Sequence, residues 1–206
     1  MRRVAQRRAA FDNIGLEAPL GTLIEKVAKR AHKVTDEDIA AVRAVGLSED
    51  EIFEIVVCGA VGQAIRQHAG TSTWSVGDRE LLAAFISQVN ETEFCIKAHS
   101  AVAGRAYRDR AKVSAALNDL DTAPISDPLR ATLRMVRKLT REHTVEADDM
   151  RALLAAGVSR ALIEDALAVC LAFNTTDRLA DTFAFAVPGP KALEAGAKFL
   201  LARGYR

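Results

Sequence analysis

One cysteine and one histidine stand a helical turn apart in the segment 90-NETEFCIKAHS-100. Cys95 and His99 are four positions apart, so on a helix their side chains lie on the same face. If Thr92 caps that helix, Cys95 lies in its first turn, where free N–H groups and the helix dipole favour a thiolate. Because a histidine one turn away can accept the thiol proton, the pair predicts a reactive cysteine.

A carboxylate at a matching distance precedes this pair. Glu80 lies ten residues before Asn90, and His99 lies nine residues after it. In two antiparallel helices joined by a tight bend at Asn90, these side chains reach the same height. Glu80 would then orient His99, directly or through a water, and His99 would deprotonate Cys95. The alternative is structural: a buried thiol beside a histidine, with Glu80 as a solvated acid.

Helical patterns cover most of the chain, and no window alternates as a strand would. Half of the residues are hydrophobic but only 5% are aromatic, a composition that suits close-packed helices. Residues 121–127, with Pro124 inside them, are typical of a linker. The sequence therefore predicts an all-α protein, with helices at 20–31, from Thr35 to before Gly46, and at 48–70, 77–89, 92–106, 128–142, 147–156, 159–180 and 189–203.

The chain contains an internal repeat with an offset of 111 residues. Residues 30–52 (RAHKVTDEDIAAVRAVGLSEDEI) align without a gap to residues 141–163 (REHTVEADDMRALLAAGVSRALI), with nine identical positions. Each copy predicts a short helix, a glycine in the left-handed region, a serine cap and a long helix. We interpret residues 20–206 as one domain of two related halves, about 20–120 and 121–206, after an N-terminal arm at 1–19.

Charge and cysteine usage exclude several classes of protein. Net charge is +1, without the clustered basic excess of a nucleic-acid binder, and no segment is apolar enough to span a membrane. The basic N-terminus is followed by no apolar run, so we expect an arm in an oligomer contact, not a secretory signal. Three distant cysteines predict a reducing, cytoplasmic compartment, with Cys58 and Cys170 as core thiols. The repeated His32 and His143 lack ligand partners at metal-site spacing and predict caps or packing.

The segment RELLAAFISQVNETEFCIKAHSAVAG resembles the active-site hairpin of the alkylhydroperoxidase D / carboxymuconolactone decarboxylase superfamily. Its peroxidases carry a glutamate, eleven residues, and then Cys-x-x-Cys-x-x-x-His. Glu80, Cys95 and His99 match the glutamate, the second cysteine and the histidine, whereas Thr92 stands at the first cysteine. The repeated Gly-x-Ser-x-x-x-Ile segments and FNTTDRLAD are also similar, so the resemblance extends over about residues 20–185.

This resemblance implies an alkylhydroperoxidase D-like helical bundle that forms a homo-oligomer, from dimer to hexamer, with no metal or organic cofactor. It also implies a thiol-dependent hydroperoxidase in which Glu80 and His99 activate Cys95. Since Thr92 replaces the resolving cysteine, turnover would need an external thiol or another cysteine. We further expect Thr92 to hydrogen-bond the sulfur or the leaving oxygen, and Asn174 to line the same cavity together with Arg178.

Two other functions remain open. One is a lyase of the decarboxylase branch, in which histidine moves protons on a small carboxylated lactone. Such a site should offer cations to the carboxylates, and only Lys97, Arg105 and Arg108 lie near the hairpin. The other is a non-catalytic helical oligomer that binds a small ligand or partner, and it would explain the loss of the resolving cysteine.

Overall fold

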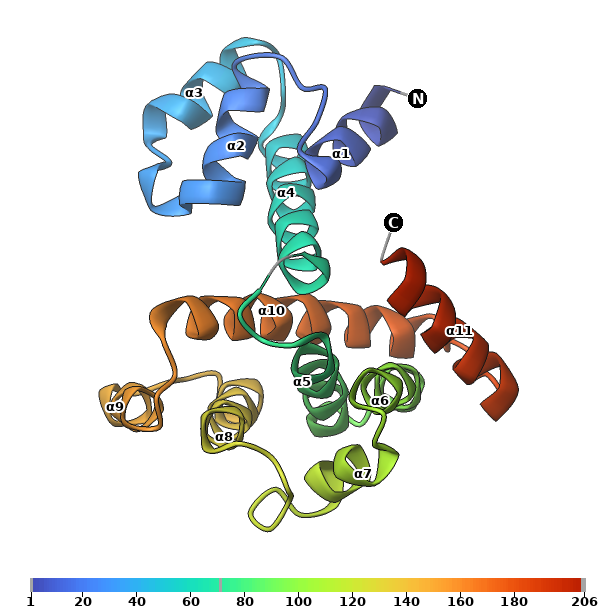
Figure 1. Cartoon of the computed structure of the whole chain (residues 1–206). Coiled ribbons are helices and arrows are strands. Elements are labelled where there is room, and N and C mark those ends of the chain that lie inside the picture. Colours follow the sequence, from blue (N-terminus) through green and yellow to red (C-terminus); the bar gives the residue numbers. More distant parts are fainter. Residues whose placement is uncertain (1, 71, 205–206) are drawn as a thin grey trace. The chain divides into compact units, whose positions relative to one another are not determined.

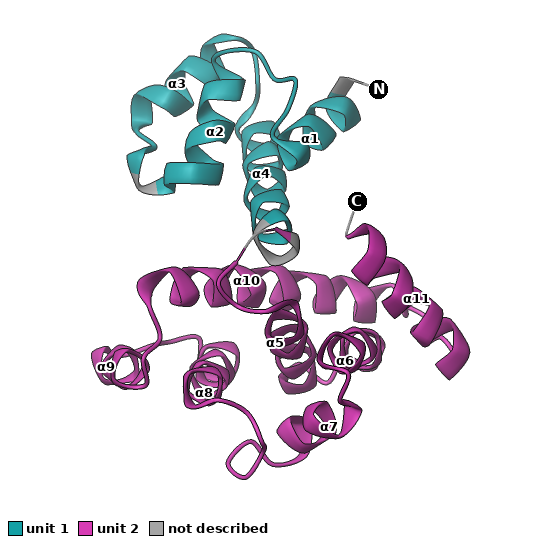
Figure 2. Ribbon diagram, in the orientation of Figure 1, with its two compact units in different colours: residues 1–66 teal, residues 67–206 magenta. Residues whose placement is uncertain are grey.

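The computed structural model describes residues 2–70 and 72–204. Within these ranges the protein has eleven α-helices, one 3-10 turn and no strand, which confirms the all-α prediction. The chain divides into two compact units, residues 1–66 and residues 67–206 (Figure 2). No helix in the described part of the chain is both long and apolar enough to cross a membrane.

The first unit is built around a small apolar core. Leu23, Ile24 and Val42 are almost fully buried in it, together with Ala10 from the first helix. The segment expected as an N-terminal arm is therefore partly helical and contributes to a core, and its predicted role in an oligomer stays a prediction. The elements of this unit are α1 (Arg2–Asp12), α2 (Leu20–Arg30), η1 (Ala31–Lys33), α3 (Asp36–Ala44) and most of α4 (Glu49–Ala69).

The second unit is arranged around α5 (Val76–Val89). Ser75 and Asp78 form a capping box at the start of this helix, and nearly every residue from Gly77 to Ser87 is buried. A helix buried on all sides needs neighbours on all sides. Four helices pack against it (Figure 1): α6 (Glu93–Tyr107), α7 (Arg110–Asn118), α8 (Asp127–Glu142) and α10 (Arg160–Thr182). The remaining helices of this unit are α9 (Ala147–Ala155) and α11 (Pro190–Arg203).

Most predicted helices lie within a few residues of the observed ones, but α7 was missed. Asp109 caps this helix by accepting a hydrogen bond from the backbone N–H of Lys112. Only Val113 and Ala116 of its nine residues are buried. Two buried positions, in a segment whose other apolar residues are mostly alanine, produce no clear period, so the pattern did not indicate a helix here.

Both copies of the sequence repeat form the local structure that the pattern predicts. Gly46 follows α3 with φ 92° and Gly157 follows α9 with φ 82°, the left-handed region in which a glycine ends a helix at little cost. Ser159 then caps α10 through the backbone N–H of Leu162. The common ancestry of the two halves, and their union in one domain, stay predictions.

The two repeated histidines take no part in a described metal site. His143 ends α8 in the left-handed region, with φ 57°, which agrees with a place at a helix end. The side chain of His32 lies outside the described residues. No group of three or more His, Cys, Asp or Glu side chains in the described part of the chain is placed to hold a metal ion.

Candidate active site

Glu80 and His99 meet directly in the second unit. Nδ1 of His99 lies 2.8 Å from Oε2 of Glu80, and the two side chains are 11% and 3% exposed. Glu91 turns the chain between α5 and α6 with φ 62°, so the two helices run antiparallel, as the spacing around Asn90 predicted. The ring of Phe173 stands edge-on to the imidazole at 4.5 Å between centroids and fixes the plane of His99. A carboxylate hydrogen-bonded to one imidazole nitrogen sets the tautomer and the orientation of the ring.

Cys95 lies one turn before His99 on α6, with its residue only 1% exposed. Thr92 is the N-cap, so Cys95 has the predicted place in the first turn. Burial nevertheless raises the pKa of Cys95 to about 12, and the carboxylate of Asp177, by its charge and by accepting a hydrogen bond, adds to this increase. The expectation of a lowered pKa is therefore wrong for this conformation, because desolvation and a nearby negative charge outweigh the helix dipole.

Asp177 is a residue of this site that the sequence analysis did not predict, as is Asp181, the other carboxylate near Cys95. Asp177 comes from α10, is 1% exposed, and accepts hydrogen bonds from Ser87 Oγ and Asn90 Nδ2, both at 2.8 Å. Burial raises the pKa of Asp177, although these bonds, the Cys95 thiol and the charge of His99 all oppose the rise. The signal available was its position three residues after Asn174, which places both on one face of a helix.

Thr92 and Asn174, the two residues expected to bind substrate, belong to the polar cluster around Asp177, and each hydrogen-bonds to other side chains. Thr92 Oγ1 donates to Oδ2 of Asp181 at 2.8 Å, so this side chain does not cap α6. Asn174 accepts from Asn90 Nδ2 at 3.2 Å and donates to Cys170 Sγ, also at 3.2 Å. Arg178, expected on the same face, is exposed and donates to the backbone carbonyl of Asn174.

Cys170 is not placed to act as a resolving thiol for Cys95 in this conformation. Cys170 precedes Asp177, the α10 residue beside the Cys95 thiol, by seven residues, which is about 10 Å along a helix. A disulfide needs Cα atoms within about 7 Å, so Cys170 would have to shift along the bundle to reach Cys95. Cys170 is instead buried beside Thr140 and Asn174, as expected of a core thiol. Cys58 belongs to the first unit and is half-buried.

Two of the three cations near the hairpin in sequence form ion pairs with acids outside the site. Lys97 pairs with Glu93 on the surface of α6 at 2.5 Å, and Arg105 pairs with Glu194 of α11 at 2.5 Å. The electrostatic neighbours that shift the pKa of Cys95 are the carboxylates Asp177 and Asp181. The site is therefore rich in carboxylates, with one imidazole and one thiol among them.

Comparison with known proteins places the fold. No family model and no curated protein sequence matches the chain. The structure resembles an uncharacterized peroxidase-related protein from Silicibacter sp. TM1040, with 22% identity and a TM-score of 0.58, over 85% of this chain and 92% of that one. It also resembles an alkylhydroperoxidase AhpD core, an uncharacterized peroxidase-related protein from Ralstonia eutropha JMP134, with 21% identity and a TM-score of 0.60, over 88% of this chain and 91% of the other. The chain thus has an alkylhydroperoxidase D-like fold.

Proposed function

We propose that the protein is a thiol-dependent hydroperoxidase in which the Cys95 sulfur attacks the peroxide. The observation that carries the proposal is the buried 2.8 Å contact between Glu80 and His99, with Cys95 one turn before His99 on the same helix. Carboxylate, imidazole and thiol are the groups that nucleophilic catalysis by cysteine requires. The alkylhydroperoxidase D-like fold supports the same reaction class.

The reaction balances without a cofactor. The Cys95 sulfur forms a bond to the distal oxygen of ROOH as the O–O bond breaks, which gives Cys95 sulfenic acid and, with the thiol proton, ROH. A first external thiol condenses with the sulfenic acid, forms a mixed disulfide and releases water. A second thiol reduces this disulfide, releases the oxidised thiol pair and restores Cys95. The external thiol is needed because Thr92 replaces the first cysteine, and a reducing cytoplasm would supply it.

Removal of the thiol proton is the demanding step in this mechanism. With its pKa near 12, Cys95 is a thiol at neutral pH in the resting conformation, and its 1% exposure keeps peroxide from the sulfur. Substrate entry must therefore open the site and be coupled to proton transfer. His99, paired with Glu80, is the proposed acceptor, and the same imidazole then protonates the leaving alkoxide.

The carboxylates of the site weigh against a lyase acting on a carboxylated substrate. Such a substrate would bring its own negative charge next to Asp177 and Glu80. Of the three cations near the hairpin, Lys97 and Arg105 pair with other acids. Arg108 follows the C-terminal end of α6, whereas Cys95 lies in the first turn of that helix. The raised pKa of Cys95 does favour the non-catalytic alternative, in which the polar cluster only holds α5, α6 and α10 together. The peroxidase and the non-catalytic protein differ in whether a hydroperoxide should oxidise Cys95.

The test is the intact mass of the protein after one equivalent of tert-butyl hydroperoxide, with dimedone present to trap sulfenic acid. The wild type should gain one dimedone adduct, and Cys95→Ser should gain none. Cys58→Ser and Cys170→Ser are matched controls that remove one thiol each and should react like the wild type. An adduct that persists in Cys95→Ser, or its absence from every protein, would refute the proposal and leave the non-catalytic reading.

We also propose that the chain acts as a homo-oligomer, from dimer to hexamer. Support comes from α10 and its C-cap residue Phe183, where Leu171, Leu179 and Phe183 are 49%, 49% and 68% exposed. Apolar side chains this exposed on one helix are typical of a surface that is covered in the working assembly. Sedimentation velocity of the purified chain measures the subunit count, and a monomer at high concentration would contradict this part of the proposal.

A further inference from the structure

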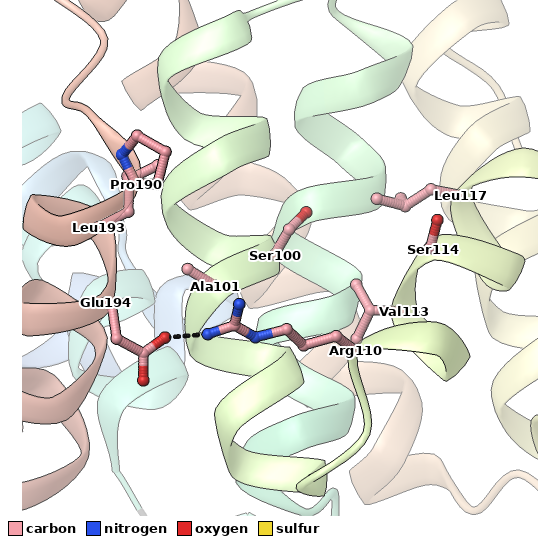
Figure 3. A pocket seen from close by; sticks show the side chains of 9 residues that line it. All are labelled: Ser100, Ala101, Arg110, Val113, Ser114, Leu117, Pro190, Leu193 and Glu194. Carbon is pink, nitrogen blue, oxygen red and sulfur yellow. Dashed lines mark hydrogen bonds and ion pairs between the residues drawn. The ribbon is translucent and has the colours of Figure 1, made fainter.

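A cavity separate from the Cys95 site lies between α6, α7 and α11. It measures about 320 Å³, near the lower end of the range for small-molecule sites. Figure 3 shows Val113, Leu117 and Leu193 along its wall, while Arg110 crosses its edge to pair with Glu194. The walls are therefore mostly apolar, with charge concentrated at one side.

This charged side continues into a second, wider hollow. Arg110 and Glu194 line both spaces, and the second one, of about 620 Å³, adds Arg105 and Arg108. Glu194 pairs with Arg105 and with Arg110, and Arg108 lines the same hollow. Arg108 forms no ion pair with any described residue, and the cluster keeps an excess of two positive charges. Guanidinium groups bind carboxylates and phosphates through paired N–H donors.

Two details indicate that the space is built to hold a ligand. Ser100 lines the cavity, and its Oγ is buried without a hydrogen-bond partner among the described residues. A buried hydroxyl without a partner costs free energy unless something else binds it. Gly104 lets Arg110 cross close above α6, since a Cβ there would lie 2.9 Å from Cγ of Arg110. The glycine thus keeps the arginine at the edge of the cavity.

The cavity is on a different side of α6 from the proposed catalytic residues. Ser100 and Gly104 are four residues apart and lie on one face of the helix, and Arg108 caps its C-terminal end. At about 100° per residue this face is rotated by about 100–140° from His99. We propose that the cavity binds a small amphipathic organic anion, with its apolar body against Val113 and its oxyanion head at the three arginines. This proposal does not depend on the proposed peroxidase activity.

Octanoate and monooctyl phosphate are the probes, because they share one apolar chain and differ in the oxyanion head. 1-Octanol has the same chain length without charge and is the matched control ligand. Binding is measured by calorimetry, and ¹⁵N amide shifts locate the site. Both anions, or one of them, should bind more tightly than octanol and shift the amides of Ser100, Ala101, Val113 and Glu194. The tighter anion identifies the preferred head.

Variants of the chain test the two halves of the site separately. The double change Arg108→Gln/Arg110→Gln should weaken binding of the tighter anion about fivefold or more, since two cations are lost, and should leave octanol unaffected. Ser114→Trp places a bulky group at an exposed position of the cavity wall and should weaken all three ligands. Arg134→Gln removes an exposed arginine of α8 that pairs with Asp121, and it is the matched control, expected to bind like the wild type.

Several results would overturn the proposal. The first two are equal affinity for octanol and both anions, and no anion binding up to about 5 mM, an affinity below which specific recognition has little meaning. The others are amide shifts centred outside the cavity, and a loss of anion affinity in Arg134→Gln equal to that in the double variant. If the double variant fails to fold, as judged by circular dichroism, Ser114→Trp alone decides: unchanged anion binding in that variant would refute the site.

Discussion

Replacing Asp177 by asparagine removes the negative charge beside the Cys95 thiol and keeps the size of the side chain. In the wild type, burial is the largest cause of the raised pKa of Cys95, and Asp177 comes next through its charge and its hydrogen bond. An asparagine oxygen can still accept from Ser87 or Asn90, and its amide can donate to sulfur. We therefore expect Asp177→Asn to lower the pKa of Cys95 while the helices stay in place.

The expected change in alkylation rate depends on the fraction of Cys95 that is thiolate and on the nucleophilicity of that thiolate. The pKa of Cys95 rises from 9.0 to about 12, and burial, which persists in the variant, is the largest part of this rise. Removal of one close charge should lower the pKa by about 1 to 2. Each decrease of 1 raises the thiolate fraction about tenfold near pH 8. It also lowers the nucleophilicity of the thiolate about threefold, so alkylation should speed up about 3- to 10-fold.

The assay is alkylation of the folded protein by iodoacetamide, followed by mass spectrometry of the peptide that carries Cys95. In the wild type the rate should keep rising between about pH 7 and pH 10, because the thiolate fraction grows until the pH reaches the pKa. In Asp177→Asn the whole profile should move to lower pH. Glu164→Gln is the matched control, since it removes an exposed acid from α10 that pairs with Arg160.

One result would refute the reasoning about this charge. If Asp177→Asn is folded by circular dichroism and Cys95 alkylates no faster than in the wild type, the carboxylate is not what keeps the thiol protonated. An equal gain in Glu164→Gln would point to a general loosening of α10 instead. The comparison of pH profiles separates the two, because loosening raises the rate at every pH without moving the profile.

Three further predictions concern the proton acceptor His99, the first turn of α6 and the backbone at Gly157. His99→Gln should slow sulfenic acid formation on tert-butyl hydroperoxide about 100-fold, as for loss of a general base; an unchanged rate would remove the relay. Thr92→Cys should form a disulfide with Cys95 after oxidation, visible as a loss of two thiols on titration, and a folded variant without it would contradict the geometry of the first turn of α6. Gly157→Ala should lower the free energy of unfolding in urea by about 1 kcal/mol, because φ is 82° there and no atom crowds the position. Gly196→Ala, in the open interior of α11, should raise it by about 1 kcal/mol, and a change of the same sign in both would refute the backbone argument.

The parts of the fold that the sequence predicts are those set by nearby residues. Gly46 and Gly157 end helices through their own backbone freedom, and the contact of Glu80 with His99 follows from counting outward from one bend. Both depend on interactions within about twenty residues of the chain. Local geometry of this kind can be predicted from the spacing and the types of the residues.

The contacts that the sequence does not predict are made by residues far apart in the chain. Asp177 and Asp181 lie more than eighty residues after Cys95, and α10 brings them to α6 only once the second unit is packed. The pairs that Glu194 makes with Arg105 and Arg110 depend on α11 in the same way. No spacing records such contacts, because the packing of helices distant in the chain decides them.

The long-range contacts also explain why a thiol in a favourable place on its helix is protonated at rest. The partial charge at the start of a helix stabilises an anion by about 0.3–1 kcal/mol when exposed. A pKa increase from 9.0 to about 12 at Cys95 corresponds to about 4 kcal/mol against the thiolate. The dipole cannot overcome that difference, but two changes on substrate entry can reduce it: water reaching the sulfur, and a proton moving onto His99 beside Glu80. A peroxidase with this site would react slowly with peroxide until both occur, so the rate of site opening, more than the pKa of the free thiol, would govern its turnover.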